Sequence, residues 1–328
     1  MEKHNYNCNW FSFRHILAMF FILFLSMYMI TLLGNMLLIT AVRLNPQLQT
    51  PMYFFLTNLA LIDICFSSTI VPLILVNTLS EDRRITWSGC ASQMFISLAL
   101  GATECLLLAV MAFDRYVAIC KPLRYHVILN QRLCVSLITS CWMLCIINSL
   151  IHVNLTFRLS FCRTHQINHY FCEVPPLFQM SCSDTWFNEF IIHISALTLG
   201  MCSFLLTLVS YFRIICTIMQ THSSEGRHKT FSSCSSHLIV VSLYYGPIMV
   251  MYLRPHSAYS PETDKTISIL YTVVTPMFNP IVYGIRNKPV IVEFLIKPLD
   301  TLQALADTLL TDYDLEVTSS LAIGQPVF

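Results

Sequence analysis

Residues 92–120 read SQMFISLALGATECLLLAVMAFDRYVAIC, and this stretch decides the fold. Its only charged side chains are Glu104, Asp114 and Arg115, and the last two stand near its end. An α-helix rises 1.5 Å per residue, so the stretch is about 43 Å long, more than the roughly 30 Å hydrocarbon thickness of a bilayer. It therefore predicts a transmembrane helix with a charged pair at one membrane surface.

Six further apolar runs have the length of a membrane span. They lie at 16–42, 53–79, 134–153, 187–219, 236–253 and 266–285, with turn and charge signals between them. The first run is far longer than the apolar region of a signal peptide, and no small-residue cleavage site follows it, so we expect it to be retained. The sequence therefore predicts an all-α fold, a seven-transmembrane helix bundle.

The composition agrees with a membrane protein and excludes two other classes. Of the 328 residues, 55% are hydrophobic and 11% are charged, whereas about a quarter of an ordinary soluble domain is charged. The formal net charge is +1, and no clustered run of Lys and Arg of the kind that binds nucleic acid is present. Hydrolase and phosphate-binding motifs are also missing, so we predict that the chain is not an enzyme. We expect membrane lipid, and no nucleic acid, among its partners.

Cysteines and basic residues predict the orientation of the bundle. Cys90 precedes the third span, and Cys162, Cys172 and Cys182 lie between the fourth and fifth spans, so these regions share one face of the membrane. Disulfides persist on the oxidising outer face, and a slight excess of Lys and Arg on the other side agrees with the positive-inside rule. The N-terminus is therefore expected outside and the C-terminus inside. The predicted parts are an extracellular segment at 1–15, the helical domain at 16–288, and a cytoplasmic helix with an acidic tail at 289–328.

Four motifs stand at helix ends in a fixed order along the chain. They are PMYFFLTNL at 51–59, MAFDRYVAIC at 111–120, SSCSSH at 232–237 and PMFNPIVY at 276–283. Together they resemble the odorant receptor family of class A G-protein-coupled receptors, and the resemblance covers residues 16–288. It implies a receptor that binds a small odorant from outside the cell and activates a stimulatory G-protein α subunit inside, which raises cyclic AMP.

The charged pair at the end of the third span is the first candidate site. Charged side chains near a membrane surface reach out of the hydrocarbon, so Asp114 and Arg115 could serve only as an interfacial anchor. The alternative is a switch, in which Asp114 holds Arg115 at rest and releases it to a partner helix. The resemblance favours the switch and implies that Arg115 contacts the G-protein α subunit. The other residues assigned to coupling are Tyr116, Tyr211, Asn279, Pro280 and Tyr283.

Two carboxylates, Asp63 and Glu104, stand well inside the predicted spans, where burying an unpaired acid is costly. They should face the interior of the bundle, with Asn35 and Asn279 near them. Two carboxyl groups this close either hold a cation or share a proton. The resemblance favours a sodium ion, and a hydrogen-bonded packing network with one acid protonated is the alternative.

We expect the ligand pocket between the outer halves of spans three, five, six and seven, because sites in helix bundles lie between helices. The outer part of span three has no Asp or Glu to neutralise an amine, so a small, mostly neutral organic ligand is favoured. Arg254 and His256 leave a weaker case for a carboxylate. Each lining residue is also a reasonable core residue. The lining candidates are Ser97, Leu98, Gly101, Ala102, Ser195, Leu199, Tyr245, Met249, Tyr252, Ile269 and Thr272.

The four cysteines of the outer face permit three disulfide connectivities, and the sequence alone does not choose among them. The resemblance implies the pairs Cys90–Cys172 and Cys162–Cys182. The stretch HYFCE at 169–173 also combines His, Cys and Glu, which are ligands of zinc and copper. A disulfide at Cys172 removes its thiolate, so we favour a packed loop over a metal site.

Two other functions compete with the receptor. A channel or transporter would use Asp63 and Glu104 as an ion path, but no internal repeat of the transporter kind is visible. A receptor-like chain with impaired signalling or trafficking is the second alternative. After residue 288 the sequence lacks the basic amphipathic helix that the family leads us to expect, and an acidic tail follows.

Overall fold

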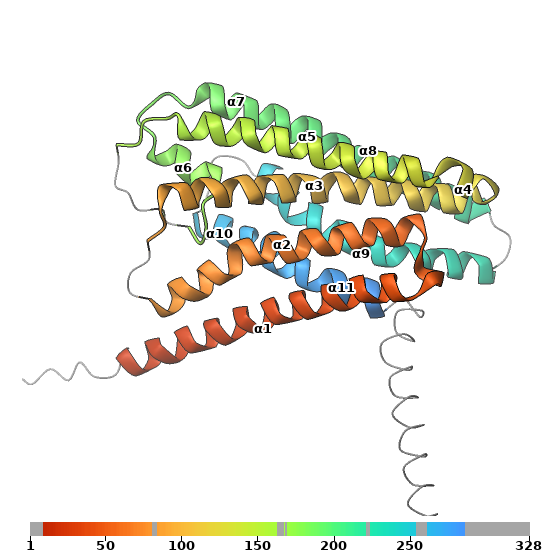
Figure 1. The fold of residues 1–328 in the computed structure, drawn as a ribbon, viewed down its shortest axis with the longest axis horizontal. Coiled ribbons are helices and arrows are strands. Elements are labelled where there is room, and N and C mark those ends of the chain that lie inside the picture. The colour runs from red at the N-terminus through yellow and green to blue at the C-terminus, as the bar shows by residue number, and fades with distance from the viewer. Residues whose placement is uncertain are drawn as a thin grey trace, which may run out of the picture.

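The computed structural model describes residues 9–80, 84–162, 167, 169–220, 224–253 and 261–285. In that part of the chain, long helices lie side by side in one bundle (Figure 1). Its only β-structure is an isolated bridge between Phe161 and Ser181. The predicted tail at 289–328, and most of the predicted N-terminal segment, lie outside the described residues.

Seven spanning units form the described bundle. Six are long and apolar enough to cross a membrane, and the seventh has a shorter apolar part at Cys234–Val250. Their bounds are α1 (Asn9–Leu44), α2 (Pro51–Leu79), α3 (Trp87–Cys120), α5 (Gln131–Phe157), α7 (Trp186–Ser195) with η3 (Ala196–Met201) and α8 (Cys202–Gln220), α9 (Ser224–Leu253), and α10 (Pro261–Ile269) with η5 (Leu270–Val274) and α11 (Thr275–Ile285). Shorter helices lie in the connections: η1 (Pro46–Leu48), η2 (Pro122–Arg124), α4 (Tyr125–Ile128) and α6 (Val174–Met180). The predicted all-α, seven-helix fold is confirmed.

Local sequence sets where several helices begin. Pro51 occupies the first turn of α2, where a backbone N–H is not needed. The Thr86 hydroxyl accepts a hydrogen bond from the Gly89 N–H at 3.1 Å at the start of α3. The Asn130 side-chain oxygen accepts from the Leu133 N–H at 2.9 Å at the start of α5. These contacts satisfy N–H groups that a helix cannot pair internally.

Helix α3 is the centre of the bundle, because it contacts α2, α5, α8 and α9. Phe55 and Phe66 of α2 and Leu107 of α3 are almost completely buried. In contrast, α1 and α8 expose large apolar side chains such as Phe20 and Phe212. An apolar outer surface of this extent suits lipid rather than water as the surrounding solvent.

Helices α1 and α11 approach each other closely at Gly34. A Cβ atom at this position would meet the Pro280 Cγ at 2.8 Å and the Cβ of the same ring at 3.0 Å. The missing side chain of Gly34 therefore permits the contact between the first and last spans.

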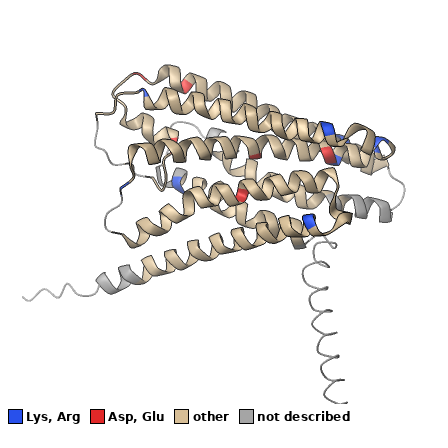
Figure 2. Ribbon diagram, in the orientation of Figure 1, with Lys and Arg blue, Asp and Glu red and all other residues tan. Residues whose placement is uncertain are grey.

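Charged residues are sparse between the two ends of the bundle (Figure 2). One end carries the Cys90–Cys172 disulfide and α6, and we call it the disulfide end. The opposite end carries Arg115 and α4, and we call it the Arg115 end.

Spans five and seven each contain a π-helical segment, η3 and η5. A π-helix pairs each N–H with the carbonyl five residues earlier, and such turns are frequent at functional sites. Leu199 lies in η3 and Thr272 lies in η5, so both segments coincide with positions predicted to line the ligand pocket.

Candidate ligand pocket and signalling switch

The connection between α5 and α7 is fastened across the disulfide end. The structure pairs Cys90 of α3 with Cys172, and Cys162 with Cys182. Gln93 of α3 adds to the Cys90–Cys172 connection, since its Oε1 accepts a hydrogen bond from the Cys172 N–H at 2.9 Å. The Gln93 Nε2 donates to a backbone carbonyl of α2 at 3.0 Å. The loop is therefore tied to α3 and, through Gln93, to α2.

Residues of three spans converge on Tyr245 of α9. Its hydroxyl donates to the Cys105 carbonyl of α3 at 3.0 Å and lies 3.1 Å from the Ser203 Oγ of α8. One residue earlier on α9, the Tyr244 hydroxyl donates to the Gly101 carbonyl. Gly101 and Tyr245 were both predicted to line the pocket, and the structure brings their helices together.

Ser97 adds a polar group to the residues of α3 that were predicted to line the pocket. Its Oγ is buried and has no hydrogen-bond partner among the described residues. Leu98 and Ala102, on the same helix, are half-buried. A buried hydroxyl without a partner is costly, so Ser97 is suited to receive a polar atom of a ligand.

Ser195 makes its side-chain hydrogen bonds with α5, which was not among the helices predicted to form the pocket. Its Oγ donates to the Asn148 Oδ1 at 2.9 Å and lies 3.0 Å from the His152 Nε2, and both partners belong to α5. The sequence placed Ser195 in the pocket, but these polar contacts direct it to α5. Leu199 stays next to α3, because its carbonyl lies 3.9 Å from the Cys105 Sγ.

The remaining pocket candidates lie on spans six and seven. Thr272 is buried, and its hydroxyl donates to the carbonyl four residues earlier at 2.6 Å. Ile269 is half-buried against the main core, and Met249 of α9 is also half-buried. The candidates whose side chains lie outside the described residues are Tyr252, Arg254 and His256.

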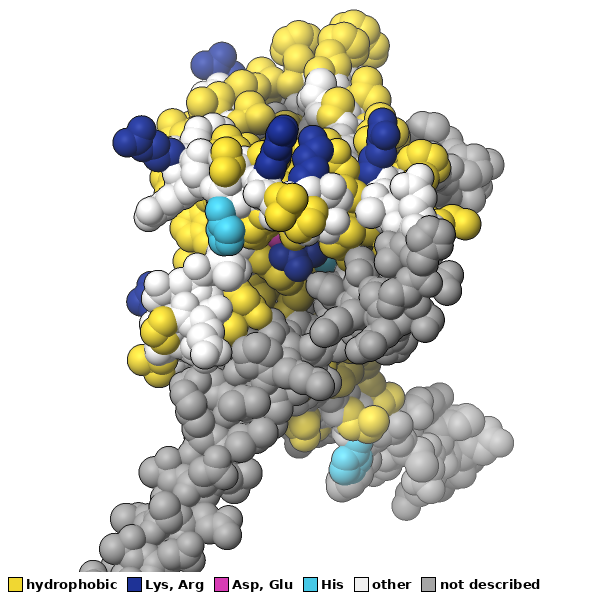
Figure 3. All heavy atoms as spheres, turned by 90° about the vertical axis from the view of Figure 1, so that its right-hand side faces the viewer, with side chains coloured by type: hydrophobic (Ala, Val, Ile, Leu, Met, Phe, Trp, Pro, Cys, Tyr) yellow, Lys and Arg dark blue, Asp and Glu magenta, His cyan; other side chains and the backbone are white. Residues whose placement is uncertain are grey.

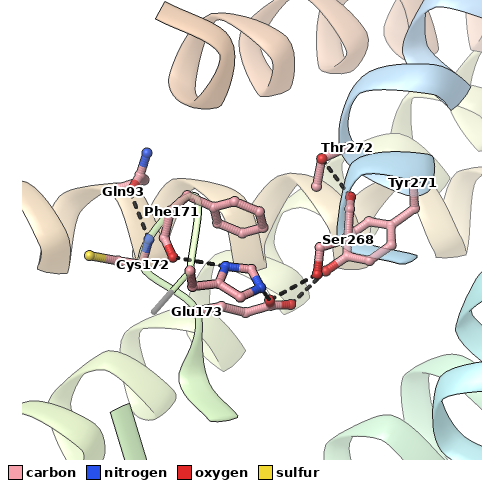
Figure 4. Close-up of polar contacts among 8 residues, drawn as sticks. Gln93, Phe171, Cys172, Glu173, Ser268, Tyr271 and Thr272 are labelled. Carbon is pink, nitrogen blue, oxygen red and sulfur yellow. Dashed lines mark hydrogen bonds and ion pairs between the residues drawn. The ribbon is translucent and has the colours of Figure 1, made fainter. Parts of the chain in front are cut away.

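A polar cluster joins the loop to span seven (Figure 4). The Glu173 carboxylate accepts a hydrogen bond from the Tyr271 hydroxyl and another from the Ser268 hydroxyl, the latter at 3.2 Å. The His169 Nε2 lies 3.3 Å from the same carboxylate. We call His169, Glu173, Ser268 and Tyr271 the loop cluster. Cys172 beside it is in a disulfide, and the described residues contain no group of three or more His, Cys, Asp or Glu that suits a metal ion.

Asp63, Glu104, Asn35 and Asn279 are all buried in the interior of the bundle, and each is at most 1% exposed. The Asn279 Nδ2 donates to both carboxylate oxygens of Asp63 at 3.0 Å. Glu104 is close enough to interact electrostatically with Asp63. Both Glu104 oxygens and the side-chain oxygens of the two asparagines have no partner among the described residues. Carboxylate and amide oxygens are the ligands that hard cations take, so these residues fit a sodium ion.

Asp114 holds Arg115 at the opposite end of the bundle. The Arg115 Nε donates to the Asp114 Oδ2 at 3.0 Å, and its Nη2 donates to the same oxygen. The other oxygen, Oδ1, accepts from the Tyr125 hydroxyl of α4 at 2.7 Å. Burial raises the pKa of Tyr125, and the neighbouring Asp114 carboxylate raises it further. The hydroxyl therefore remains a donor, and Asp114 is bound on both sides.

Tyr116, Tyr211 and Tyr283 of the predicted switch lie near this pair, whereas Asn279 contacts Asp63 and Pro280 lies against Gly34. Tyr211 of α8 and His237 of α9 stack, with the Tyr211 Oη 2.7 Å from the His237 Nδ1. Tyr283 of α11 is buried, and its hydroxyl has no partner among the residues that the structure describes. The Lys121 Nζ lies 5.7 Å from the centre of the Tyr116 ring. Spans three, five, six and seven thus meet at the Arg115 end.

Comparison with known proteins covers most of the chain. The family model described as olfactory receptor matches residues 24–299. This chain belongs to the olfactory receptor family. Similar proteins include Olfactory receptor 5AP2 of Mus musculus, 45% identical over 82% of this chain and 85% of that protein. Olfactory receptor 2G3 of Homo sapiens is 46% identical over 83% of this chain and 88% of that protein. Olfactory receptor-like protein OLF1 of Canis lupus familiaris is 46% identical over 82% of this chain and 87% of that protein.

As an olfactory receptor, the protein is a multi-pass protein of the plasma membrane and not an enzyme. It takes an odorant as its ligand and a G protein as its partner. The family membership excludes the channel or transporter that the sequence left as an alternative.

Lys and Arg side chains gather on the Arg115 end of the olfactory receptor (Figure 3). Those exposed there are Arg43, Lys121, Arg124, Arg132 and Arg213. A surplus of basic residues is typical of the cytoplasmic side of a membrane protein.

An open groove of about 560 Å³ lies on the surface of the receptor at the start of α5. Its lining residues are Gln131, Arg132, Val135, Ser136, Thr139 and Ser140. They all belong to one helix, whereas the predicted ligand pocket lies between several helices. We therefore do not assign the odorant to this groove.

Three parts of the receptor site were not predicted. Tyr125 lies in a connection outside every apolar run, and no local pattern indicates its contact with Asp114. His237 ends the motif SSCSSH, and a histidine at the edge of an apolar run was a usable signal for a buried hydrogen bond. Glu173 follows the loop cysteine directly, so the disulfide indicated that this acid lies near the helices.

Proposed function

We propose that this olfactory receptor binds a small, mostly neutral organic odorant at its disulfide end, which faces the outside. We further propose that its Arg115 end activates a stimulatory G-protein α subunit and so raises cyclic AMP. The observation that carries the proposal is the confinement of Arg115, whose described hydrogen bonds both go to the neighbouring Asp114. An arginine held in this way can exchange its partner without unfolding its helix, and a switch requires such a choice between two arrangements.

The pocket residues support a neutral ligand with one polar group. Ser97 offers a hydroxyl, while Leu98, Ala102 and Met249 offer apolar surface. The carboxylate nearest to the pocket in the loop, Glu173, is already engaged by its own neighbours. An apolar pocket with few polar groups is the usual design of a site for a small organic molecule.

We also propose that Asp63 and Glu104 hold a sodium ion in the resting receptor, with Asn35 and Asn279 as further oxygen ligands. When bound, the ion supplies the positive charge that balances two carboxylates in the interior of the bundle. The hydrogen bonds from Asn279 to Asp63 link this site to α11. A change at the two acids therefore acts on span seven, which also carries Tyr283.

The substitution Arg115→Ala tests the coupling. In cells with a cyclic AMP reporter, we expect the response to an odorant mixture that activates the wild type to be lost at equal surface expression. Ligand affinity should stay within about tenfold, because Arg115 acts on the pocket only through coupling between sites. Arg158→Ala, an exposed arginine directly after α5 and away from the Arg115 end, is the control and should respond like the wild type.

A normal cyclic AMP response of Arg115→Ala would contradict the proposed switch. Surface labelling of intact cells tests the alternative of impaired signalling or trafficking. A wild-type receptor that stays inside the cell, or that reaches the surface and responds to no mixture, would favour that alternative.

A further inference from the structure

The contacts of His169 favour a proton between its ring and Glu173. The Nδ1 lies 3.2 Å from the Phe171 carbonyl oxygen, and the Nε2 lies 3.3 Å from the Glu173 Oε2. A carbonyl and an ionised carboxylate only accept hydrogen bonds, and a neutral imidazole has only one N–H. One ring nitrogen of a neutral His169 would therefore direct its lone pair at an oxygen. A charged imidazolium, or a protonated carboxyl group, satisfies both contacts.

The contact is largely enclosed by the protein. The side chain of His169 is 4% exposed and that of Glu173 is 21% exposed. The His169 ring packs edge-on against Phe171, with 4.9 Å between ring centroids, and Phe171 is buried in the main core. Because little water reaches this place, loss of the proton leaves a repulsive contact that solvent does not repair.

The same carboxylate connects the loop to span seven. Ser268 and Tyr271, which donate to Glu173, are 95 and 98 residues away from it in the chain. On its other side the loop is held to α3 by the Cys90–Cys172 disulfide. Glu173 therefore links the loop to span seven (Figure 4), and His169 contacts the same carboxylate.

We propose that the loop cluster is a latch operated by protons, in which the His169–Glu173 pair takes up a proton from the outer medium and then holds the loop against span seven. The protonated pair belongs to the closed latch, so acidification strengthens the latch, and a rise in pH removes the proton and loosens the loop. The position of the cluster on the outside rests on the orientation given in the proposed function.

Several groups of the described residues lie around the pair. Span seven contributes the Tyr271 and Ser268 hydroxyls, and Lys265 lies three residues before Ser268 on α10. From α3 come the uncharged Gln93 and Cys90, whose sulfur is in the disulfide and does not titrate. Among the described residues, the His169–Glu173 contact is the one to which the proposal assigns the proton.

Hydrogen–deuterium exchange of the full-length receptor in lipid nanodiscs tests the latch without any odorant. After correction for intrinsic exchange rates, we expect amides of residues 169–180 to be about fivefold better protected at pH 6 than at pH 8, the factor expected for one hydrogen bond. This interval brackets the range in which histidine usually changes charge. His169→Gln and Glu173→Gln should abolish the difference. His193→Gln and Glu189→Gln, two exposed residues of α7, are matched controls that should keep it.

Two further variants check the link to span seven. Tyr271→Phe and Ser268→Ala remove donors through which Glu173 holds span seven, so each should lower the protection of the loop at pH 6 and reduce the pH difference. Equal protection of the wild type at both pH values would overturn the latch, and so would an unchanged difference in His169→Gln. Basal cyclic AMP, measured in cells at both pH values, separates the two proposals. An exchange difference with no cyclic AMP signal under any condition would leave the latch standing and refute the signalling function.

Discussion

Glu104 differs from the other acids of the spans in what surrounds its oxygens. Asp63 accepts two hydrogen bonds from Asn279, and Asp114 accepts from Arg115 and Tyr125. The Glu104 oxygens have no partner within the described part of the chain. An ionised carboxyl in such surroundings is too costly to persist alone, so Glu104 carries either a cation or a proton.

Replacement of sodium distinguishes the two states of Glu104. If the resting receptor binds sodium better than the active one, mass action favours rest as sodium rises. Exchanging sodium for a bulky organic cation at constant ionic strength should then raise basal cyclic AMP by about fivefold, the lower end of the usual coupling between sites. Glu104→Gln should remove this dependence, and Glu189→Gln should keep it. Basal activity that ignores sodium but follows pH would show a shared proton instead.

At the scale of elements, the contact between α1 and α11 depends on one missing side chain. The ring of Pro280 is rigid and cannot move away from a Cβ atom placed on Gly34 at 2.8 Å. The two helices must then separate. Because α11 also carries Asn279 and Tyr283, the position of the switch residues depends on this contact.

The substitution Gly34→Ala should destabilise the receptor by about 1–3 kcal/mol, the usual cost of overpacking. Gly284→Ala on α11 is the matched control, since nothing lies within 4 Å of its added Cβ. Gly284→Ala should leave the stability of the receptor unchanged or raise it slightly, because alanine favours a helix more than glycine does. Thermal unfolding in detergent micelles measures both. Equal melting temperatures of the two variants would refute the steric argument.

The elements also show what the sequence could predict. A membrane span needs about 20 apolar residues, so the position of every span could be predicted from composition alone. The helix ends could not, because polar caps set them. Helix α3 begins at Trp87, after the Thr86 cap, and not at residue 92. The π-helical segments were also beyond prediction, since an apolar stretch has the same composition in either kind of helix.

The candidate site divides in the same way. Arg115, Asp63 and Glu104 could be found because a charge inside an apolar run is conspicuous. The partners of Glu173 could not be found, because the contact joins a loop to a span 98 residues further along the chain. The contacts of Ser195 could not be predicted either, because they join α7 to α5, where Asn148 and His152 bind its hydroxyl.

At the scale of the whole molecule, two disulfides hold the connection between α5 and α7, and they close loops of different length. The Cys90–Cys172 bond joins residues 82 apart and ties the loop to α3, whereas Cys162–Cys182 joins residues 20 apart within the loop. A longer closed loop restricts the unfolded chain more, by about 1 kcal/mol for this difference in length.

Removing the first bond should therefore be the more damaging change. We expect the double variant Cys90→Ser with Cys172→Ser to lose more surface expression and thermal stability than Cys162→Ser with Cys182→Ser. Changing both partners avoids a free thiol that could form a wrong pair. Flow cytometry of intact cells and melting temperatures of purified receptor measure the order. The reverse order would show that the Cys162–Cys182 bond contributes more to stability than the Cys90–Cys172 bond.

The π turn η5 separates two halves of span seven that are anchored to different parts of the receptor. On one side Ser268 is bonded to Glu173 of the loop, and on the other Asn279 is bonded to Asp63 of α2. A π turn contains an additional residue compared with an α turn. Passing that residue along the helix would rotate one half against the other by about 100° while both remain helical. A small axial shift at one end of span seven would thus be converted into a rotation of the helix at the other end.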